Sequence, residues 1–330
     1  MDTAFDREGA RTALAAAAEF AGLAPSIHNT QPWRWRLTGV ALQLRAERRR
    51  QLGVTDPGGH LLLLSCGSAL YHATTALAAE GWRADVRRIP ERGDDDLLAT
   101  ITVTGRVPAS TQAMHAVQVL RIRHTDRRPV SDVPASAEAI RAVAASAATA
   151  GASLHLLRSE DVIDLAAAAN RAQEIELADP QWLDEVAYWA GGVRRDGAGV
   201  PASAIPREPL ATTVPGRNFG RSGDLPVSAG HDGAAAYAIL FGQDNTPGGW
   251  LRAGEAFTAA WVTAIEHGLS VVPLSAAVEI PTTRQSMRHI LGYVAEPYLA
   301  LRLGIAAADE PGPGATPRLP AVQILEVVKG

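Results

Sequence analysis

The sequence predicts an α+β protein made of two related halves. Apolar and polar residues alternate over 33–45, which is the period of β-strands, whereas the long apolar stretch 59–80 has the length of a buried helix. The two halves are indicated by a weak internal similarity. The stretches 67–82 and 254–269 are both helix-length, and both close on a Glu-Gly or Glu-His-Gly sequence before a β-rich segment.

The first elements follow from hydrophobic periodicity and from residues that begin or end helices. A helix over 5–21 has apolar residues on one face and ends at Gly22 and Pro25. Strand alternation around the turn signal Thr38-Gly39 predicts a β-hairpin over 33–45. A buried helix over 59–80, strands over 82–89 and 97–104, and a helix from Ser110 or Thr111 to about 122 follow.

The second part of the chain is predicted in the same way. Helices are expected at 135–149, 159–178, 181–190, 249–267 and 282–291, and strands at 153–157, 236–242 and 297–304. Residues 191–230 are rich in Gly, Pro, Ser and Arg without a sustained period, so they are either a disordered insertion or a functional loop such as a lid. We expect the halves to be 1–115 and 116–330.

Composition excludes several classes of function. The 330 residues are 47% apolar and carry a net charge of −4, which gives no reason to expect nucleic acid or an anionic membrane as a partner. No apolar run is long enough for a membrane span, and no signal peptide is recognisable. Cys66 is the only cysteine, so no intrachain disulfide can form and a reducing cytoplasmic compartment fits. The histidines show no metal-ligand spacing.

The loop over 24–32 is the first candidate site. Ser26, His28, Asn29, Thr30 and Gln31 offer many donors and acceptors between two prolines that stiffen the loop. The residue types alone are equally compatible with an ordinary capped turn, because Ser, Asn and Pro favour turns.

The string Pro25-Ser26-x-x-Asn29-x-Gln31-Pro32-Trp33 resembles the signature of nitroreductase-like flavoproteins. With His28 and Thr30 it is most similar to the Acg branch, in which two copies of the fold are fused in one polypeptide. The resemblance implies a tandem (fused pseudo-dimer) nitroreductase-like fold, each half a mainly antiparallel sheet packed with helices. It also implies an FMN cofactor. The loop residues expected to contact FMN are Ser26, His28, Asn29, Thr30, Gln31 and Pro32.

The second candidate site is the basic cluster that begins at Arg123. By itself, a cluster such as Arg123-His124-Thr125-Asp126-Arg127 is usually a solvated turn. It resembles, however, the R-x-S/T-x-R/K motif of nitroreductase domains. The resemblance implies that Arg123 and Thr125 hold the flavin phosphate and ribityl chain, and that Arg127 lies near N1 and O2 of the ring. It also implies that Arg318 adds to the phosphate site, where residue type alone would indicate a solvated arginine.

The distribution of the two motifs predicts a single flavin site. Residues 1–110 contain the loop motif without the arginine motif, and the chain after residue 123 contains the arginine motif without a second loop motif. In the family each flavin takes one motif from each subunit. We therefore expect one FMN per chain, in a monomer that acts as a pseudo-dimer or associates further.

The resemblance implies an FMN-dependent oxidoreductase of the nitroreductase type. Hydride would pass from NADPH or NADH to the flavin, and electrons would leave to a small-molecule acceptor such as a nitro compound or quinone. The alternative is a non-enzymatic protein that binds or sequesters FMN, with the 191–230 segment as a lid that occludes the flavin.

Overall fold

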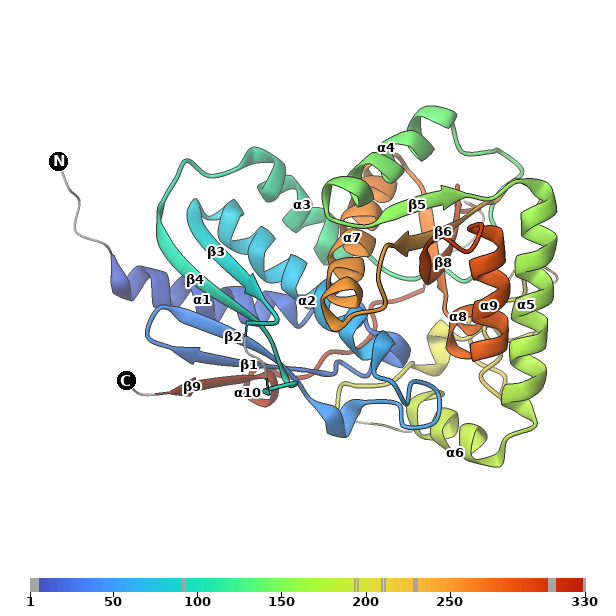
Figure 1. Cartoon of the computed structure of the whole chain (residues 1–330), viewed down its shortest axis with the longest axis horizontal. Coiled ribbons are helices and arrows are strands. Elements are labelled where there is room, and N and C mark those ends of the chain that lie inside the picture. The colour runs from blue at the N-terminus through green and yellow to red at the C-terminus, as the bar shows by residue number, and fades with distance from the viewer. Residues whose placement is uncertain are drawn as a thin grey trace.

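The computed structural model describes residues 6–90, 93–192, 194, 196–208, 210, 212–227, 231–307 and 313–328. The chain forms two β-sheets that lie on either side of a pair of central helices (Figure 1). The first sheet has the order β3-β4-β2-β1-β9, and the second has the order β5-β6-β8-β7. All neighbouring strands are antiparallel except β1 and β9. The strands are β1 Trp33–Thr38, β2 Ala41–Ala46, β3 Trp82–Arg88, β4 Leu97–Arg106, β5 Ser153–Leu156, β6 Ala236–Gly242, β7 Ser270–Leu274, β8 Glu296–Gly304 and β9 Leu325–Val328.

The helices begin where capping residues are present. Ser110, Ser136 and Thr246 accept hydrogen bonds from the first turns of α3, α4 and α7, which satisfies backbone donors that have no partner within the helix. The helices are α1 Arg7–Ala21, α2 His60–Ala79, α3 Thr111–Ile122, α4 Ala137–Thr149, α5 Ser159–Leu177, α6 Pro180–Trp189, α7 Pro247–Glu266, α8 Ala276–Glu279, α9 Pro281–Ile290 and α10 Ala321–Ile324, with short 3₁₀ turns at 27–29, 48–50 and 202–204.

The two halves repeat one arrangement. The strand order β3-β4-β2-β1 in the first sheet matches β7-β8-β6-β5 in the second, and α1 and α2 correspond to α4 and α7. The main difference lies between the first two strands of each repeat. The β1–β2 hairpin turns at Gly39 and Val40, whereas β5 and β6 are separated by α5, α6 and the 191–230 segment. The predicted α+β class with two related halves is confirmed.

Helices α2 and α7 meet at a reciprocal glycine contact. A Cβ on Gly67 would lie 2.0 Å from the carbonyl oxygen of Leu251, and a Cβ on Gly254 would lie 1.9 Å from that of Leu64. Leu64 and Gly67 occupy the same relative positions on α2 as Leu251 and Gly254 on α7. The contact is therefore nearly two-fold symmetric, and only glycine permits such a close approach of the two backbones.

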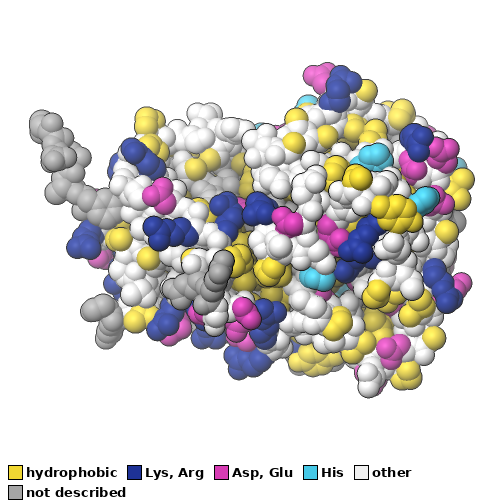
Figure 2. All heavy atoms as spheres, in the orientation of Figure 1, with side chains coloured by type: hydrophobic (Ala, Val, Ile, Leu, Met, Phe, Trp, Pro, Cys, Tyr) yellow, Lys and Arg dark blue, Asp and Glu magenta, His cyan; other side chains and the backbone are white. Residues whose placement is uncertain are grey.

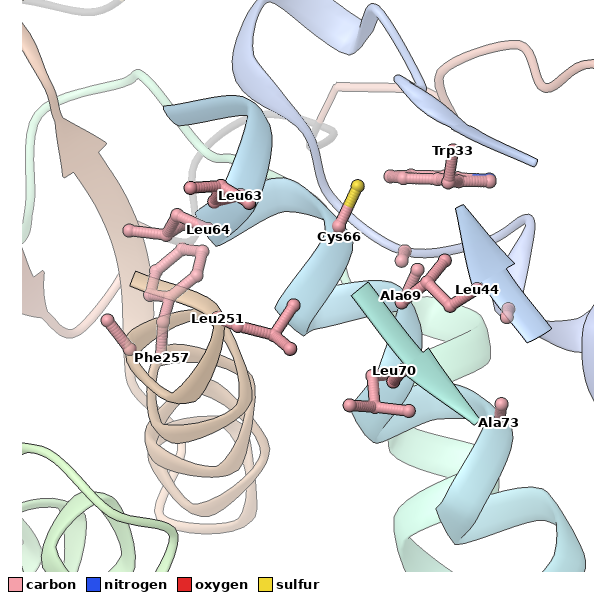
Figure 3. Close-up of a cluster of buried hydrophobic side chains, with 14 of the residues drawn as sticks. Trp33, Leu44, Leu63, Leu64, Cys66, Ala69, Leu70, Ala73, Leu251 and Phe257 are labelled. Carbon is pink, nitrogen blue, oxygen red and sulfur yellow. The ribbon is translucent and has the colours of Figure 1, made fainter. Parts of the chain in front are cut away.

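Helix α2 is the centre of the largest hydrophobic core. Figure 3 shows Cys66 and Ala69 on the side of Trp33 and Leu44, while Leu64 lies on the side of Phe257 from α7. By length and composition α2 could cross a membrane, but 72% of its most apolar stretch is buried inside the fold. A buried core helix of a globular protein can have the same length and composition, so these features are only weak evidence that α2 spans a membrane.

Most predicted elements are present within two residues of their expected bounds. The sequence patterns do not predict strands β7 and β9. β7 has only five residues, and β9 follows a Pro- and Gly-rich stretch, so neither shows a sustained alternation. β9 pairs with β1 of the first sheet although it lies near the C-terminus. The division of the chain at residue 115 stays a prediction.

The surface seen in Figure 2 has basic and acidic side chains interspersed, without a large area of one sign on that face. Several exposed arginines of the described residues have acidic partners, such as Arg158 with Glu160. Such pairs add little stability individually, since exposed charges remain well solvated.

We expect Gly67→Ala and Gly254→Ala each to lower the free energy of unfolding by at least about 1–3 kcal/mol, the usual cost of overpacking a core. The added methyl group would force the α2 and α7 backbones apart. Urea titration measures the effect. Gly105→Ala is the matched control, because a Cβ there meets nothing within 4 Å. Equal stability of all three variants would contradict a tight contact between these helices.

Candidate functional site

A cavity of about 480 Å³ lies where the two halves meet. This size is within the range of about 300–1,000 Å³ that is typical of small-molecule sites. Its wall combines the polar loop after α1, the N-terminal part of α2, the face of α7 with Phe257 and Trp261, and strands β7 and β8. Ile205, Arg217 and Phe219 from the 191–230 segment also line it. The described part of that segment is therefore packed at the cavity.

The polar loop is held in an unusual backbone conformation. His28, Asn29 and Gln31 have φ angles of 45°, 53° and 51°, in the left-handed region that non-glycine residues seldom adopt. Ser26 stabilises the turn, since its hydroxyl accepts a hydrogen bond from the backbone N–H of Gln31 at 2.9 Å. The hydroxyl of Ser65 on α2 accepts one from Ile27 at 3.1 Å. Backbone strain of this kind is often found at functional sites.

Two of the predicted loop residues bind other segments of the protein. The Asn29 amide donates to the carbonyls of Gly199 and Pro317 at 2.9 and 3.0 Å. The Gln31 amide donates to Gly197 at 2.8 Å and accepts from the Leu319 N–H at 2.9 Å. Ser26 and His28 line the large cavity, and Asn29 lines a smaller neighbouring one; Thr30, Gln31 and Pro32 line neither.

The smaller cavity, of about 70 Å³, is lined by arginines. Arg123, Arg127 and Arg318 all reach it, and Thr125 and Arg127 line both cavities. Arg123 stacks on the Trp261 ring at 4.5 Å, and Arg127 donates to the Ala204 carbonyl at 2.9 Å. Arg318 donates to the Leu23 carbonyl at 3.1 Å and to the Asn29 amide oxygen at 3.2 Å. The structure thus brings the two sequence motifs and Arg318 together.

These three arginines form an uncompensated cationic site. Among the described residues no carboxylate lies within ion-pair distance of them, since Asp126 pairs with Arg128 instead. Burial lowers the pKa of all three, and the neighbouring Arg318 lowers that of Arg123 further. Arg217 and Arg302 also lower the pKa of Arg127. Buried like charges repel strongly, so an anion in the smaller cavity would relieve this cost.

His28 adds an uncharged polar group at the cavity wall. Its ring is buried, and burial lowers its pKa to about 3, with Arg217 as the next cause. Both ring nitrogens lack a hydrogen-bond partner among the described residues. The imidazole lies 5.7 Å from the Phe219 ring. A neutral histidine in this position can donate one hydrogen bond and accept another.

Arg217 anchors the 191–230 segment to helices α5 and α8. Its guanidinium contacts Glu176 of α5 at 3.3 Å and also pairs with Glu279 of α8 and with Ser275 at 3.2 Å. All three charged side chains are at least 90% buried. One guanidinium shared by two buried carboxylates favours retention of a proton, and burial raises the pKa of Glu176 to about 8.

Several cavity residues were not predicted from the sequence. Phe257 and Trp261 belong to a helix whose apolar residues all look like core positions. Glu176 and Glu279 are isolated acids in helices that give no sign of facing one another. Arg302 is the one of these residues that the sequence could have indicated, because its charge interrupts a largely apolar strand. Tyr188 and Trp189, at the end of α6, stack with Arg194 and are not among the residues that line the large cavity.

The fold and cavities define an α+β protein with a candidate site whose arginines would suit an anionic small molecule. Within the described residues, no group of three potential metal ligands is found. No protein-family model matches the sequence.

Two proteins of Mycobacterium tuberculosis H37Rv named "Putative NAD(P)H nitroreductase" are similar to the chain over almost its whole length. Rv3131 is 38% identical over 334 residues, which covers 99% of this chain and 94% of that protein. The protein named acg is 29% identical over 323 residues and covers 95% of both chains. The chain belongs to this family of NAD(P)H nitroreductases.

Solved structures give weaker similarities. A nitroreductase with bound FMN from Desulfitobacterium hafniense DCB-2 has a TM-score of 0.41 at 12% identity, covering 65% of this chain and 98% of that one. The FMN and NADPH-dependent nitroreductase NfnB from Sphigopyxis sp. strain HMH also has a TM-score of 0.41, at 15% identity, covering 65% and 99%.

We expect His28→Asn to flatten the decline of stability in acid. The native His28 pKa, about 3, lies below the unfolded value of 6.5, so between these values the folded protein binds fewer protons than the unfolded chain. Stability is therefore lost as the pH falls below about 6.5, by up to about 1.4 kcal/mol per pH unit from this residue. Asparagine tolerates the left-handed backbone and carries no titrating group.

The measurement is the free energy of unfolding at pH 7 and pH 5 for both proteins. Any effect of the substitution on the backbone conformation should change the free energy of unfolding by the same amount at pH 7 and at pH 5. The informative quantity is therefore the difference between the free energies at the two pH values. Parallel pH profiles would show that His28 is not held neutral in the fold.

Proposed function

We propose that this chain is an FMN-dependent oxidoreductase that uses NADPH or NADH and reduces a nitro- or quinone-like small molecule. The observation that carries the proposal is the cluster of Arg123, which is buried, with Arg127 and Arg318, which are partly buried. None of the three has an acidic partner among the described residues, and they lie beside the large cavity. A phosphate group carries close to two negative charges and matches the donors of arginine. Thr125, at the same cavity, offers a hydroxyl.

The larger cavity fits the rest of such a ligand. Phe257, Trp261 and Leu299 give it an apolar wall suited to a flat ring system. His28 offers ring nitrogens without partners, and Ser26 offers a hydroxyl at the same wall. The candidate contacts are thus the residues implied by the family resemblance, except that Thr30, Gln31 and Pro32 line neither cavity and are proposed to support the loop.

The protein's own contribution would be binding, orientation and exclusion of water. Bound FMN would supply the redox chemistry, accepting electrons from NAD(P)H and passing them to the acceptor. Arg123 and Arg318 would hold the phosphate end. Arg127 would place a fixed positive charge along the larger cavity, where it stabilises negative charge that develops on a ligand. Phe219 and Arg217 would keep water from the wall opposite α7.

One FMN per chain is supported by the asymmetry of the two halves. Residues 22–32 connect α1 to β1 and carry the polar loop, but the equivalent connection from α4 to β5 is only 150–152. At the α7 positions that correspond to Ser65 and Ser68, the chain has Arg252 and Glu255. Glu255 is buried and forms two 2.7 Å hydrogen bonds with Arg88 of β3. Helix α7 therefore has charged side chains at both positions where α2 has serines, and it offers no counterpart of Ser65, which lines the large cavity.

We propose further that 1–115 and 116–330 are the two functional halves and that the 191–230 segment acts as a lid. We also propose a cytoplasmic location, because the only cysteine, Cys66, is buried and burial raises the pKa of its thiol. Such a thiol is unreactive and has no partner for an intrachain disulfide.

Sequestration of FMN without turnover is the second candidate. The observation in its favour is the position of Phe219, which packs against His28 and lies under the Arg127 guanidinium at 5.4 Å. The buried ion pairs of Arg217 fasten the same stretch of chain. A segment fixed in this way would deny a nicotinamide access to the ring.

We expect Arg123→Met, Arg127→Met and Arg318→Met each to weaken FMN binding roughly tenfold to hundredfold, as loss of a charge-assisted hydrogen bond does. Fluorescence titration measures both affinity and stoichiometry. Arg121→Met is the matched control, since Arg121 is exposed on α3 and stacks on Phe20. FMN binding that is unaffected by all three changes would refute the phosphate site, and two FMN per chain would refute the single site.

Turnover and sequestration are separated by anaerobic reduction of the FMN-loaded protein. We expect the flavin absorbance band to bleach on addition of NADPH or NADH, because the proposed enzyme accepts electrons from them. If neither nucleotide bleaches the band while dithionite does, the protein is a flavin-sequestering protein for these donors. Free FMN with the same nucleotides is the control for uncatalysed reduction.

A further inference from the structure

Arg302 is a buried arginine in the central strand of the second sheet. It lies in β8 between β6 and β7, its side chain is 5% exposed, and it lines the large cavity. Neither family motif includes it. A buried charge in a sheet is costly unless it is paired and hydrogen-bonded, so a role for its guanidinium is expected.

The guanidinium holds the turn that carries the second motif. One terminal nitrogen of Arg302 donates to the carbonyl of Asp126 at 2.9 Å and to that of Arg128 at 2.6 Å. These carbonyls belong to the residues on either side of Arg127. The other terminal nitrogen pairs with Asp232 at 2.7 Å, and Asp232 in turn accepts the Val130 N–H at 2.8 Å. The backbone from 126 to 130 is thus tied to β8.

We propose that Arg302 is a positioning residue that sets the direction of Arg127 at the cavity wall. The inference rests on the proposed function, because Arg127 is the cation assigned to the ligand there. Among the described residues, the Arg127 side chain donates a hydrogen bond to the Ala204 carbonyl and contacts the Phe219 ring. Both partners belong to the 191–230 segment. The Val130–Ala306 bridge and the hydrogen bond from the Ser131 N–H to the Ile305 carbonyl join the chain to the end of β8 a few residues further on. Among the described residues, the Arg302 bonds are the ones that hold the carbonyls beside Arg127 to the sheet.

An arginine suits this task better than a lysine. Its planar fork reaches two carbonyls and a carboxylate at fixed angles, whereas an ammonium is a single point of charge. The Arg302 Nε has no partner among the described residues, so one donor remains at the edge of the cavity. Asp232 pairs with Arg302, and this limits the positive charge that Arg302 adds around Arg127.

The test compares three variants as FMN-loaded proteins: Asp232→Asn, Asp232→Asn/Arg302→Met and Asp232→Asn/Arg302→Lys. The asparagine removes the countercharge but keeps an oxygen for the Val130 N–H, so the double variants do not bury an unpaired carboxylate. We expect the methionine variant to bind FMN at least about tenfold more weakly than Asp232→Asn, because Arg127 is no longer held. The reduction potential of its bound flavin should shift to more negative values.

The lysine variant should recover part of both losses, since an ammonium can still donate to the two carbonyls. A role limited to stability would lower the melting temperature and leave the potential of the bound flavin unchanged, which would overturn the proposal. Equal FMN affinity in Asp232→Asn and Asp232→Asn/Arg302→Met would also overturn it. A wild-type protein that binds no FMN would instead refute the proposed function itself, together with this inference.

Discussion

The close contact between α2 and α7 determines the geometry of the whole molecule. Helices usually pack with their axes about 8–10 Å apart, and glycines at the crossing point bring the backbones to the near end of that range. Gly67 and Gly254 each face a carbonyl of the other helix. Since each helix is also the main support of one sheet, this crossing fixes how the two sheets face each other and where the α2 and α7 walls of the large cavity lie.

The arginines of the interior fall into two groups, those that pair with a carboxylate and those without such a partner among the described residues. Arg217 and Arg302 are buried with carboxylate partners, and they connect segments that lie far apart in the sequence. Arg123, Arg127 and Arg318 are buried or partly buried, have no carboxylate partner among the described residues and converge on the smaller cavity. Paired charges of the first kind connect segments of the structure, whereas cations of the second kind would be stabilised by an anionic ligand. The contrast points to the candidate site independently of any motif.

Sequence patterns predicted the regular elements well and the site only in part. Periodicity and capping residues located α1 to α7, because each of these has a long apolar face or a clear terminus. The resemblance brought His28, Arg127 and Arg318 forward as candidates, and the structure places them around connected cavities. It did not reveal that Asn29 and Gln31 fasten the segments around 197–199 and 317–319.

Other contacts in the structure cannot be predicted from any local sequence pattern. Glu176 and Glu279 meet at Arg217 only after α5, α8 and the 191–230 segment have packed together. The same applies to β9, whose place beside β1 depends on a partner strand nearly the whole chain away. Long-range pairing of this kind is a property of topology, and local propensity does not contain it.

The short α4–β5 connection has a consequence for how such a protein can change over time. In a symmetric homodimer, one gene encodes both binding sites, so every substitution occurs twice and a harmful change cannot be confined to one site. Joining the copies in one chain removes that restriction. The two parts of this chain differ accordingly: the α1–β1 connection carries the polar loop 22–32, whereas the α4–β5 connection is only 150–152, and Glu255 of α7 pairs with Arg88 of β3. Each part can therefore change without a matching change in the other, and the large cavity is lined by unequal contributions from the two.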